Sequence, residues 1–592
     1  MKNVSPEYAA SMAQPLRERS YIQITFENID PEAASDGAWV PNNQLPFSEV
    51  ETLDYEYIYG TPYATLELNR WGLDASQDIL PNDIADVRED GYTSEVLSGQ
   101  GGVFTDIPIL TRKFSKQRTL AGLTITFDTR TQDRPDAIRI QYYRGVETVK
   151  TTDVTSIPGI TLTVNDPVED IDQIEISAIS NLPKTRFRVE RIIFGVIKQF
   201  DNSIVNRCKQ NHDVDPLTRR LPKESFSYSI LDYAQQYNPD NPAGDWNFVN
   251  EKSPISIRYG YEVRPGEIEW VDPDKYIMNG KPGYKDNVAT FSGTGVIESM
   301  TDTYYKDVVG DKTLYDMAVS VLRDADLTPT PSGGEPWAID ESLKTMRTTA
   351  VLPITTHMNC LQIIAHAARC RFFTDSENII HIEPFAIPEG DPVFSVDLST
   401  ISEKGQSFSK IDKLKAVEVK KYNYALNSDV TDIFKEEEVT ETYRHIEFSG
   451  MFSDVNVSVS GGSVIKSDVY GRAIDLTLSE GTKSVTITGK GYKESTTVYR
   501  LDVSANGEVD VEENALITND EMCKAFAAHA AAYLRYRNTY DIMYRGNPEL
   551  ETQDLISLQS KFTDSMRGLV LTDELSFSGS LSGKVKVKVL EV

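Results

Sequence analysis

The chain contains few cysteines for its length, four among 592 residues. This number is too small for a disulfide framework in a chain of this size. Cys360 and Cys370 fall on one expected helix. At ~1.5 Å of rise per residue they would lie about 15 Å apart, well beyond the ~7 Å Cα limit of a disulfide. We therefore expect reduced, buried thiols.

Long apolar runs are also missing. No stretch approaches the ~20 apolar residues that span a bilayer. The first residues, MKNVSPEYAASMAQPLRERSY, are polar and interrupted by two prolines, which is not the pattern of a secretory signal. We expect no membrane-spanning segment and synthesis in a cytoplasm.

Basic charge is in deficit. The chain has 60 lysines and arginines against 90 aspartates and glutamates, a net charge of −30. This balance argues against a nucleic-acid binder, which normally carries a basic surface. Two interpretations of the acidic surface stay open: it keeps a large protein soluble, or it lines a passage that DNA crosses without adhering. Composition does not separate them.

Recognisable catalytic or metal motifs are absent as well. The six histidines are scattered, and neither H-E-x-x-H nor C-x-x-C occurs. The nearest approach to a metal site is His212 with Asp213 and Asp215, in an expected loop where such residues form turns more often than they bind ions. His366 and His529 fall on or beside apolar helix faces, as core histidines do.

A phosphate site is equally weakly supported, because Gly293-Thr-Gly295 lacks the rest of the glycine fingerprint. A carboxylate pair at glycosidase spacing stays open among the many acidic residues. We predict a protein that is not an enzyme, with no catalytic, cofactor-binding or metal-binding residue and no cofactor.

Alternating strands dominate what is present, most clearly in residues 213–262. Phe226, Tyr228 and Ile230 face one side of an expected strand and serines face the other. A second strand around Ile257 alternates in the same way. A period of two predicts half-buried strands of an antiparallel sheet. The connection at 237–244 is rich in proline, asparagine and glycine, which form turns.

Helical stripes occur in three places. The apolar spacing predicts helices at 313–323, 359–371 and 518–537. Thr313 with Asp316, and Thr518 with Glu521, have the spacing of capping boxes. The run at 584–589 alternates lysine and valine, which predicts an edge strand with its lysines in solvent. Pairing of this strand with a neighbouring molecule stays open.

The N-terminal third resembles the discoidin-like, galactose-binding jelly roll that phages of Gram-positive bacteria attach to tail proteins. The matching runs are Tyr63–Leu68, Ser115–Phe127 and Arg186–Gly195. The resemblance implies loops that can hold a sugar. Trp71 could supply a stacking face, although an aromatic residue in a sandwich is more often part of the core. No sugar-binding residue is predicted.

A second resemblance is more specific. The runs Asp215-Pro-Leu-Thr, Phe226–Tyr233, Tyr237–Pro242, Ile257–Glu262 and Gly266–Trp270 look like the first β-domain of phage baseplate or tail-tip hub proteins. That family's domain has the fold of the tail-tube protein. Residues 515–592 resemble the family's second barrel. The resemblance implies a trimeric ring that continues the six-fold tail tube, with DNA passing through its centre.

These patterns predict a mainly β, multidomain chain. The expected parts are an N-terminal arm (1–20), a discoidin-like jelly-roll sandwich (21–197), a first tube-like β-barrel (198–310), a small α/β subdomain (311–400), a second tube-like β-barrel (401–445 with 504–592) and an inserted immunoglobulin-like β unit (446–503).

The function that the resemblance implies is that of a structural virion protein at the tail tip or baseplate, made in the host bacterial cytoplasm. Its partners would be copies of itself, distal tail, tube, spike or fibre proteins, host surface glycans, and phage DNA that passes without specific binding. Two alternatives stay open: a host-surface carbohydrate-binding tail protein, and the hub of a phage-like contractile injection system.

Overall fold

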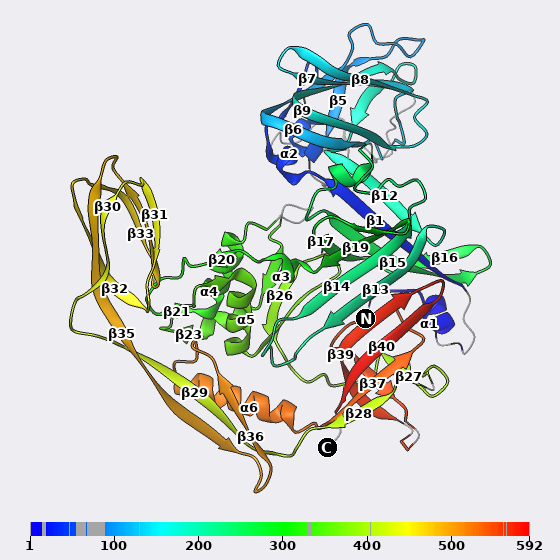
Figure 1. Ribbon diagram of the computed structural model, residues 1–592. Coiled ribbons are helices and arrows are strands. Elements are labelled where there is room, and N and C mark those ends of the chain that lie inside the picture. Colours follow the sequence, from blue (N-terminus) through cyan, green and yellow to red (C-terminus); the bar gives the residue numbers. More distant parts are fainter. Residues whose placement is uncertain are drawn as a thin grey trace.

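The computed structural model describes residues 2–12, 14, 19–46, 48–54, 67, 89–129, 131–242, 244–327, 334–402, 404–560, 562–563 and 565–590 (Figure 1). Strands far outnumber helices, and the buried side chains form several separate cores. The chain is mainly β and multidomain, which confirms the expected fold class. No helix in the described part of the chain is long and apolar enough to cross a membrane.

The N-terminal sandwich, at the top of Figure 1, is built on two long strands that pair with each other, β6 (Ile109–Thr126) and β9 (Thr161–Ser180). Phe127, Ile140 and Phe187 are fully buried in its core. The other elements are β2 (Trp39–Pro41), β3 (Ser48–Glu49), η1 (Val50–Asp54), β4 (Glu89–Asp90), β5 (Tyr92–Leu97), β7 (Ala137–Arg144), β8 (Glu147–Thr155), β10 (Arg186–Val189) and β11 (Arg191–Ile193).

Trp71, suggested as a sugar-stacking residue, lies outside the described residues. Of the run 63–68, the structure describes Glu67. The carboxylate of Glu67 is buried and accepts a hydrogen bond from Arg188 Nη1 at 3.1 Å. The sugar-stacking role of Trp71 therefore stays a prediction.

Strand β1 (Ser20–Ile29) joins the first barrel, although the sequence pattern placed it in the sandwich. It pairs on one side with β12 (Gly195–Asp201) and on the other with β15 (Pro254–Arg264). Its buried side chains, Ile22, Ile24 and Phe26, enter the barrel core. Alternation shows that a strand has one apolar face but not which sheet it joins. The sandwich is therefore inserted between two neighbouring strands of the barrel.

A single sheet of 15 strands runs through both barrels in the order β12-β1-β15-β17-β19-β14-β13-β39-β40-β37-β28, with side branches. The ladder between β13 and β39, from Cys208 opposite Phe577 to Asp213 opposite Thr572, connects the two halves; we call it the barrel junction. The first-barrel strands are β13 (Val205–Asp213), β14 (Lys223–Leu231), β16 (Glu267–Trp270), β17 (Asp274–Met278), β18 (Gly283–Lys285) and β19 (Val288–Thr294), with η2 (Asp245–Phe248) beside them.

Aromatic packing fills the first barrel. Phe226, Tyr228 and Ile230 are buried, as their alternation predicted. The rings of Tyr228 and Phe291 stack with centroids 4.7 Å apart, and Tyr237 meets Phe291 edge to face at 5.0 Å. Such pairs add about 0.5–1.5 kcal/mol each beyond the area they bury. The turn-rich connection at 237–244 thus contributes an anchor to the core.

The second barrel corrects the interpretation of the C-terminal strand. β40 (Leu581–Val589) lies between β37 and β39 and is an interior strand, although we expected residues 584–589 to form an edge. Lysine alternation marks one polar face but does not exclude neighbours on both sides. The other strands are β27 (Phe394–Val396), β28 (Ser407–Lys410), β37 (Asn538–Tyr544), β38 (Leu555–Leu558) and β39 (Met566–Phe577).

Three long helices and one short helix pack into a single core beside the barrels. Thr313 caps the first as expected, because its hydroxyl accepts from the N–H of Asp316 at 3.0 Å. The second ends at Ala368, because Arg369 takes the left-handed conformation with φ 59°. The elements are α3 (Val296–Ser299), α4 (Leu314–Asp324), α5 (His357–Ala368), α6 (Asp520–Leu534), η3 (Glu341–Thr345), and strands β20 (Thr303–Tyr304), β21 (Lys312–Thr313), β22 (Trp337–Ile339), β23 (Arg347–Thr348), β24 (Thr355–Thr356), β25 (Cys370–Thr374) and β26 (Ile380–Pro384).

A long ribbon, at the lower left of Figure 1, changes two expected boundaries. β29 (Leu414–Leu426) pairs with β35 (Lys483–Asp502) and β36 (Glu508–Glu513), and it packs against α6. Residues 414–426, 508–513 and 520–534 thus lie outside the second barrel in which we placed them. The insertion unit, besides the far half of β35, contains β30 (Thr431–Val439), β31 (Tyr443–Glu447), β32 (Phe452–Ser460), β33 (Val464–Val469) and β34 (Ala473–Leu478).

All four cysteines are free and buried, as expected. Burial raises the pKa of the thiols of Cys208, Cys360 and Cys370 to about 12, so they stay protonated at neutral pH. They contribute to packing as small apolar side chains.

The structure moves the N-cap of α6 by one residue from the expected Thr518. Asn519 caps it, accepting from the N–H of Met522 at 2.9 Å. We predict that Asn519→Ala lowers the free energy of unfolding by about 0.5–2 kcal/mol, the range for a lost N-cap. Thr518→Ala is the matched control and should cost less, since Thr518 has only a 3.3 Å hydroxyl contact with Thr348. Urea denaturation measures both, and a larger loss for Thr518→Ala would contradict this assignment.

Candidate functional site

Beside the barrel junction lies a partly open, mainly polar cavity of about 450 Å³. Both barrels, the β25–β26 hairpin and the N-terminal segment contribute to its lining. Inward-facing positions of alternating strands place carboxylates and amides here, among them Gln210 on β13, Asp274 on β17 and Asp573 on β39. Polar groups at such positions need partners, because an unpaired buried group destabilises the fold.

Asp274 is the centre of this cluster. Lys2 Nζ and Gln210 Nε2 each lie 2.5 Å from one of its carboxylate oxygens. Burial opposes ionisation of Asp274, but the neighbouring charges of Lys2 and His212 outweigh it and hold the pKa below its usual value. Burial, together with the charge of Asp274, raises the pKa of Asp573 well above the ordinary carboxyl range. Their surroundings thus shift the pKa values of the two acids in opposite directions.

The residues suggested as a metal site do not converge. His212 Nε2 lies 2.6 Å from the hydroxyl of Tyr276. Asp213 accepts from Thr572 Oγ1 at 2.8 Å and from Arg220, while Asp215 accepts the N–H of Leu217 in a turn. In the described part of the chain, no group of three or more histidines, cysteines or carboxylates could hold a metal ion.

The N-terminal arm packs onto the first barrel. Helix α1 (Pro6–Met12) buries Tyr8 and Met12 against Tyr261 and Val271 of the first barrel. Its first residues continue to the second barrel, where the N–H of Lys2 donates to the carbonyl of Glu549 at 2.9 Å. The N-terminal segment therefore contacts both barrels. Its polar sequence, with few apolar residues, did not predict this role.

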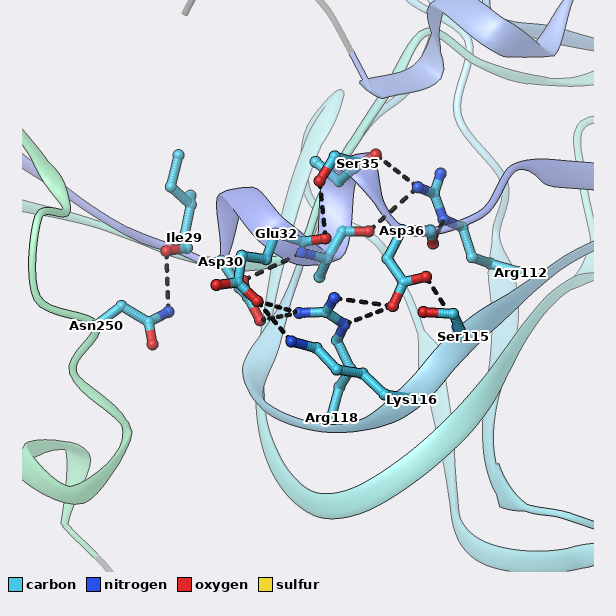
Figure 2. A network of polar contacts seen from close by, with 12 residues as sticks. Ile29, Asp30, Glu32, Ser35, Asp36, Arg112, Ser115, Lys116, Arg118 and Asn250 are labelled. Atoms are coloured by element: carbon cyan, nitrogen blue, oxygen red, sulfur yellow. Dashed lines mark hydrogen bonds and ion pairs between the residues drawn. The ribbon is translucent and has the colours of Figure 1, made fainter. Parts of the chain in front are cut away.

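A second polar network joins the sandwich to the first barrel (Figure 2). Helix α2 (Pro31–Ser35) follows β1 directly, and the guanidinium of Arg118 donates to Asp36 at 2.8 and 2.9 Å and to Glu32 at 3.2 Å. On the barrel side, Asn250 Nδ2 donates to the carbonyl of Ile29 at 2.9 Å. These contacts fix the chain where it leaves the barrel for the sandwich.

Arg112 of β6 binds helix α2 from within the sandwich. Its side chain is fully buried, and its guanidinium donates to the carbonyls of Ala33 and Ala34 at 3.1 and 2.6 Å. It also pairs with Asp54 at 2.5 Å. Removal of one member of such a buried set leaves the others unpaired, which makes it costly.

The remaining residues singled out in the sequence have structural surroundings. His366 is buried beside Glu512, 3.3 Å away, and Asn514. His529 packs against Phe385, and burial lowers its pKa to about 4. Gly293 and Gly295 lie at the end of β19, where the N–H of Gly295 donates to the carbonyl of Glu224.

Strand β28 forms one edge of the shared sheet. β28 pairs on one side with β37, and no strand among the described residues pairs with its other side. All four of its residues are exposed. Phe408 is 53% exposed and its ring lies 5.0 Å from that of Tyr540. An exposed strand edge with an aromatic residue is a place where another chain can add a strand.

No family model matches the sequence, and no curated protein matches it. Among solved structures, the chain is similar to a tail protein from Neisseria meningitidis, with 10% identity, a TM-score of 0.38, and coverage of 66% of this chain and 93% of that one. A prophage MuSo2 tail protein from Shewanella oneidensis gives 10% identity, a TM-score of 0.36, and 66% and 95% coverage. The prophage tail protein gp18 from Listeria monocytogenes gives 7% identity, a TM-score of 0.35, and 66% and 91% coverage.

The link in Figure 2 should weaken in acid. Burial opposes ionisation of Asp36, but the N–H of Ser115 and the guanidinium of Arg118 outweigh it and lower its pKa from 3.8 to about 2. Because the folded pKa is the lower one, the contribution is present above pH 3.8 and is lost as the pH falls through about 2. We predict that Asp36→Asn destabilises the sandwich by roughly 1.5–3 kcal/mol at pH 7, the range for hydrogen bonds to charged groups. The difference from wild type should shrink towards pH 2.

Thermal or urea denaturation across this pH range measures the effect. Asp153→Asn is the control, because Asp153 pairs with Arg139 on the sandwich surface, where both side chains are nearly half exposed and such pairs contribute little. Equal effects of the two substitutions at pH 7, or a difference for Asp36→Asn that does not change with pH, would contradict the prediction.

Proposed function

We propose that the chain is a structural protein of a phage tail that forms a hub ring at the tail tip or baseplate. The observation that carries the proposal is the continuous sheet through both barrels, joined by the β13–β39 ladder and open at β28. The sequence resemblance supports it independently, since residues 213–270 and 515–592 look like the two tube-like barrels of hub proteins.

The architecture suits a closed ring. Two barrels in each chain allow three copies to present six similar units, which matches the six-fold symmetry of a tail tube. Closed rings of identical copies need one surface that meets a different surface of the next copy. The exposed edge of β28 offers backbone donors and acceptors for such a contact.

The other parts have roles in the same assembly. The sandwich and the insertion unit extend away from the shared sheet in Figure 1, where they can meet other tail proteins or the host surface. The centre of the ring would let DNA pass. A contractile injection system would use the same ring.

Oligomeric state tests the proposal. We predict that the purified chain sediments at about three times its mass of 66.3 kDa, and that Phe408→Asp shifts it towards the single copy. A charge at this position disfavours the pairing of strand edges. Val146→Asp is the control, since Val146 is a fully exposed residue in the turn between β7 and β8 of the sandwich.

Sedimentation velocity over a range of concentrations gives the answer. Trimers for the wild type and the Val146 variant, with dissociation of the Phe408 variant, support a ring that closes through β28. A wild-type chain that stays a single copy at every concentration contradicts the ring. Trimers of unchanged stability for Phe408→Asp contradict the role of the β28 edge.

A further inference from the structure

The outward face of the barrel junction carries a distinctive set of side chains. Strands β13, β14, β39 and β40 lie next to one another, and their inward residues lie in the barrel cores or line the polar cavity. Every outward residue within 207–213, 223–229, 572–576 and 582–586 is polar or charged. We call these outward residues the junction face.

The charge of this face is opposite to that of the chain. Although the chain has a net charge of −30, the junction face contains only two carboxylates, Asp213 and Glu574. Its cations outnumber them: Arg207, Lys209, Lys223, Lys584 and Lys586. The acidic surface that one of the two interpretations assigns to a DNA passage is therefore not uniform over these strands.

Three of the cations make no close ion pair in the described part of the chain, although Lys586 and Lys223 act at longer range on the carboxylates of Asp213 and Glu298. Lys209 pairs with Glu574 at 2.9 Å, and Lys584 lies 3.7 Å from Asp541 of β37. Arg207, Lys223 and Lys586 are exposed, and none of them makes an ion pair within the described residues. Exposed cations that form no close ion pair can still bind an anion from solution.

The neighbouring groups match phosphate. The ladders place Lys209 opposite Ser227 and Arg207 opposite Ser229, and they place Asp213 beside Lys223. Cations on one strand, such as Lys584 and Lys586, recur at about 6.8 Å, twice the rise per residue. Lysine, arginine, serine, threonine and asparagine are the side chains that contact nucleic-acid phosphates.

A protein partner fits this face less well. Protein interfaces are built on buried aromatic and aliphatic anchors, and no outward residue of the junction face is apolar. An open hollow of about 520 Å³ on this face is lined by lysines, hydroxyls and the carboxylates of Asp213, Asp541 and Glu574. Its Arg220 is already paired with Asp213. The face therefore offers contacts to phosphates rather than readout of base edges. It would bind the backbone of a duplex without sequence preference.

We propose that the junction face binds the phosphate backbone of duplex nucleic acid, weakly and independently of sequence, through Arg207, Lys223 and Lys586. The contact consists of cation–phosphate pairs that displace counterions, so it weakens as salt increases. The proposal goes beyond ring formation and does not depend on it, because the face lies within one chain.

Fluorescence anisotropy with a labelled duplex of arbitrary sequence tests the proposal on the full chain. The test variant is Lys223→Glu with Lys586→Glu. The matched control is Lys435→Glu with Lys466→Glu, which makes the same change in net charge on strands β30 and β33 of the insertion unit, where both lysines are more than half exposed. Far-UV circular dichroism verifies that both variants fold.

We expect the wild type to bind at low ionic strength, and the test variant to bind at least ~10-fold more weakly with a salt slope smaller by about 1 for each lost phosphate contact. The control should bind within about two-fold of the wild type. Absence of binding by the wild type, or equal losses in the two variants, overturns the proposal. Sedimentation of the same samples reports the ring separately, so a monomer that still binds DNA contradicts only the ring.

Discussion

The ladder between β13 and β39 is the contact on which the rest of the structure depends. It joins strands 359 residues apart at Asp213 and Thr572. Its side chains do more than pair the backbones, since Leu575 and Phe577 of β39 lie in the core of the first barrel. The first barrel therefore lacks part of its own core without the second, and the two should unfold together as one cooperative unit.

Much of the local structure could be predicted from the sequence, because it follows from periodicity. The alternation of Phe226, Tyr228 and Ile230 identified a buried face, and the Thr313 cap fixed the start of α4. Long-range assignments were less successful, as β1 and β40 show. An alternating apolar face shows that a strand is half buried. The strands with which it pairs depend on contacts between residues hundreds of positions apart.

The polar cluster at the barrel junction was missed for a related reason. Gln210 follows the buried Cys208 and Asp573 precedes the buried Leu575 on the inward sides of their strands, and these polar interruptions were the available signal. Lys2, which pairs with Asp274 of the same cluster, lies 272 residues from it and has no motif around it. Charge was also misleading as a bulk property: a total of −30 does not describe how carboxylates and lysines are divided among faces.

The distance along the chain between β13 and β39 has a consequence for biosynthesis. The ribosome completes β13 long before β39, so a nascent first barrel waits with an open edge and an unfinished core. Contacts of such high sequence separation form slowly, and exposed edges favour exchange of identical elements between molecules. In a ring, each chain could pair its β13 with β39 of a neighbouring chain instead of with its own β39. The strand pairing would be the same in both forms. The local concentration of nascent chains on one messenger RNA would then determine which of the two forms is assembled.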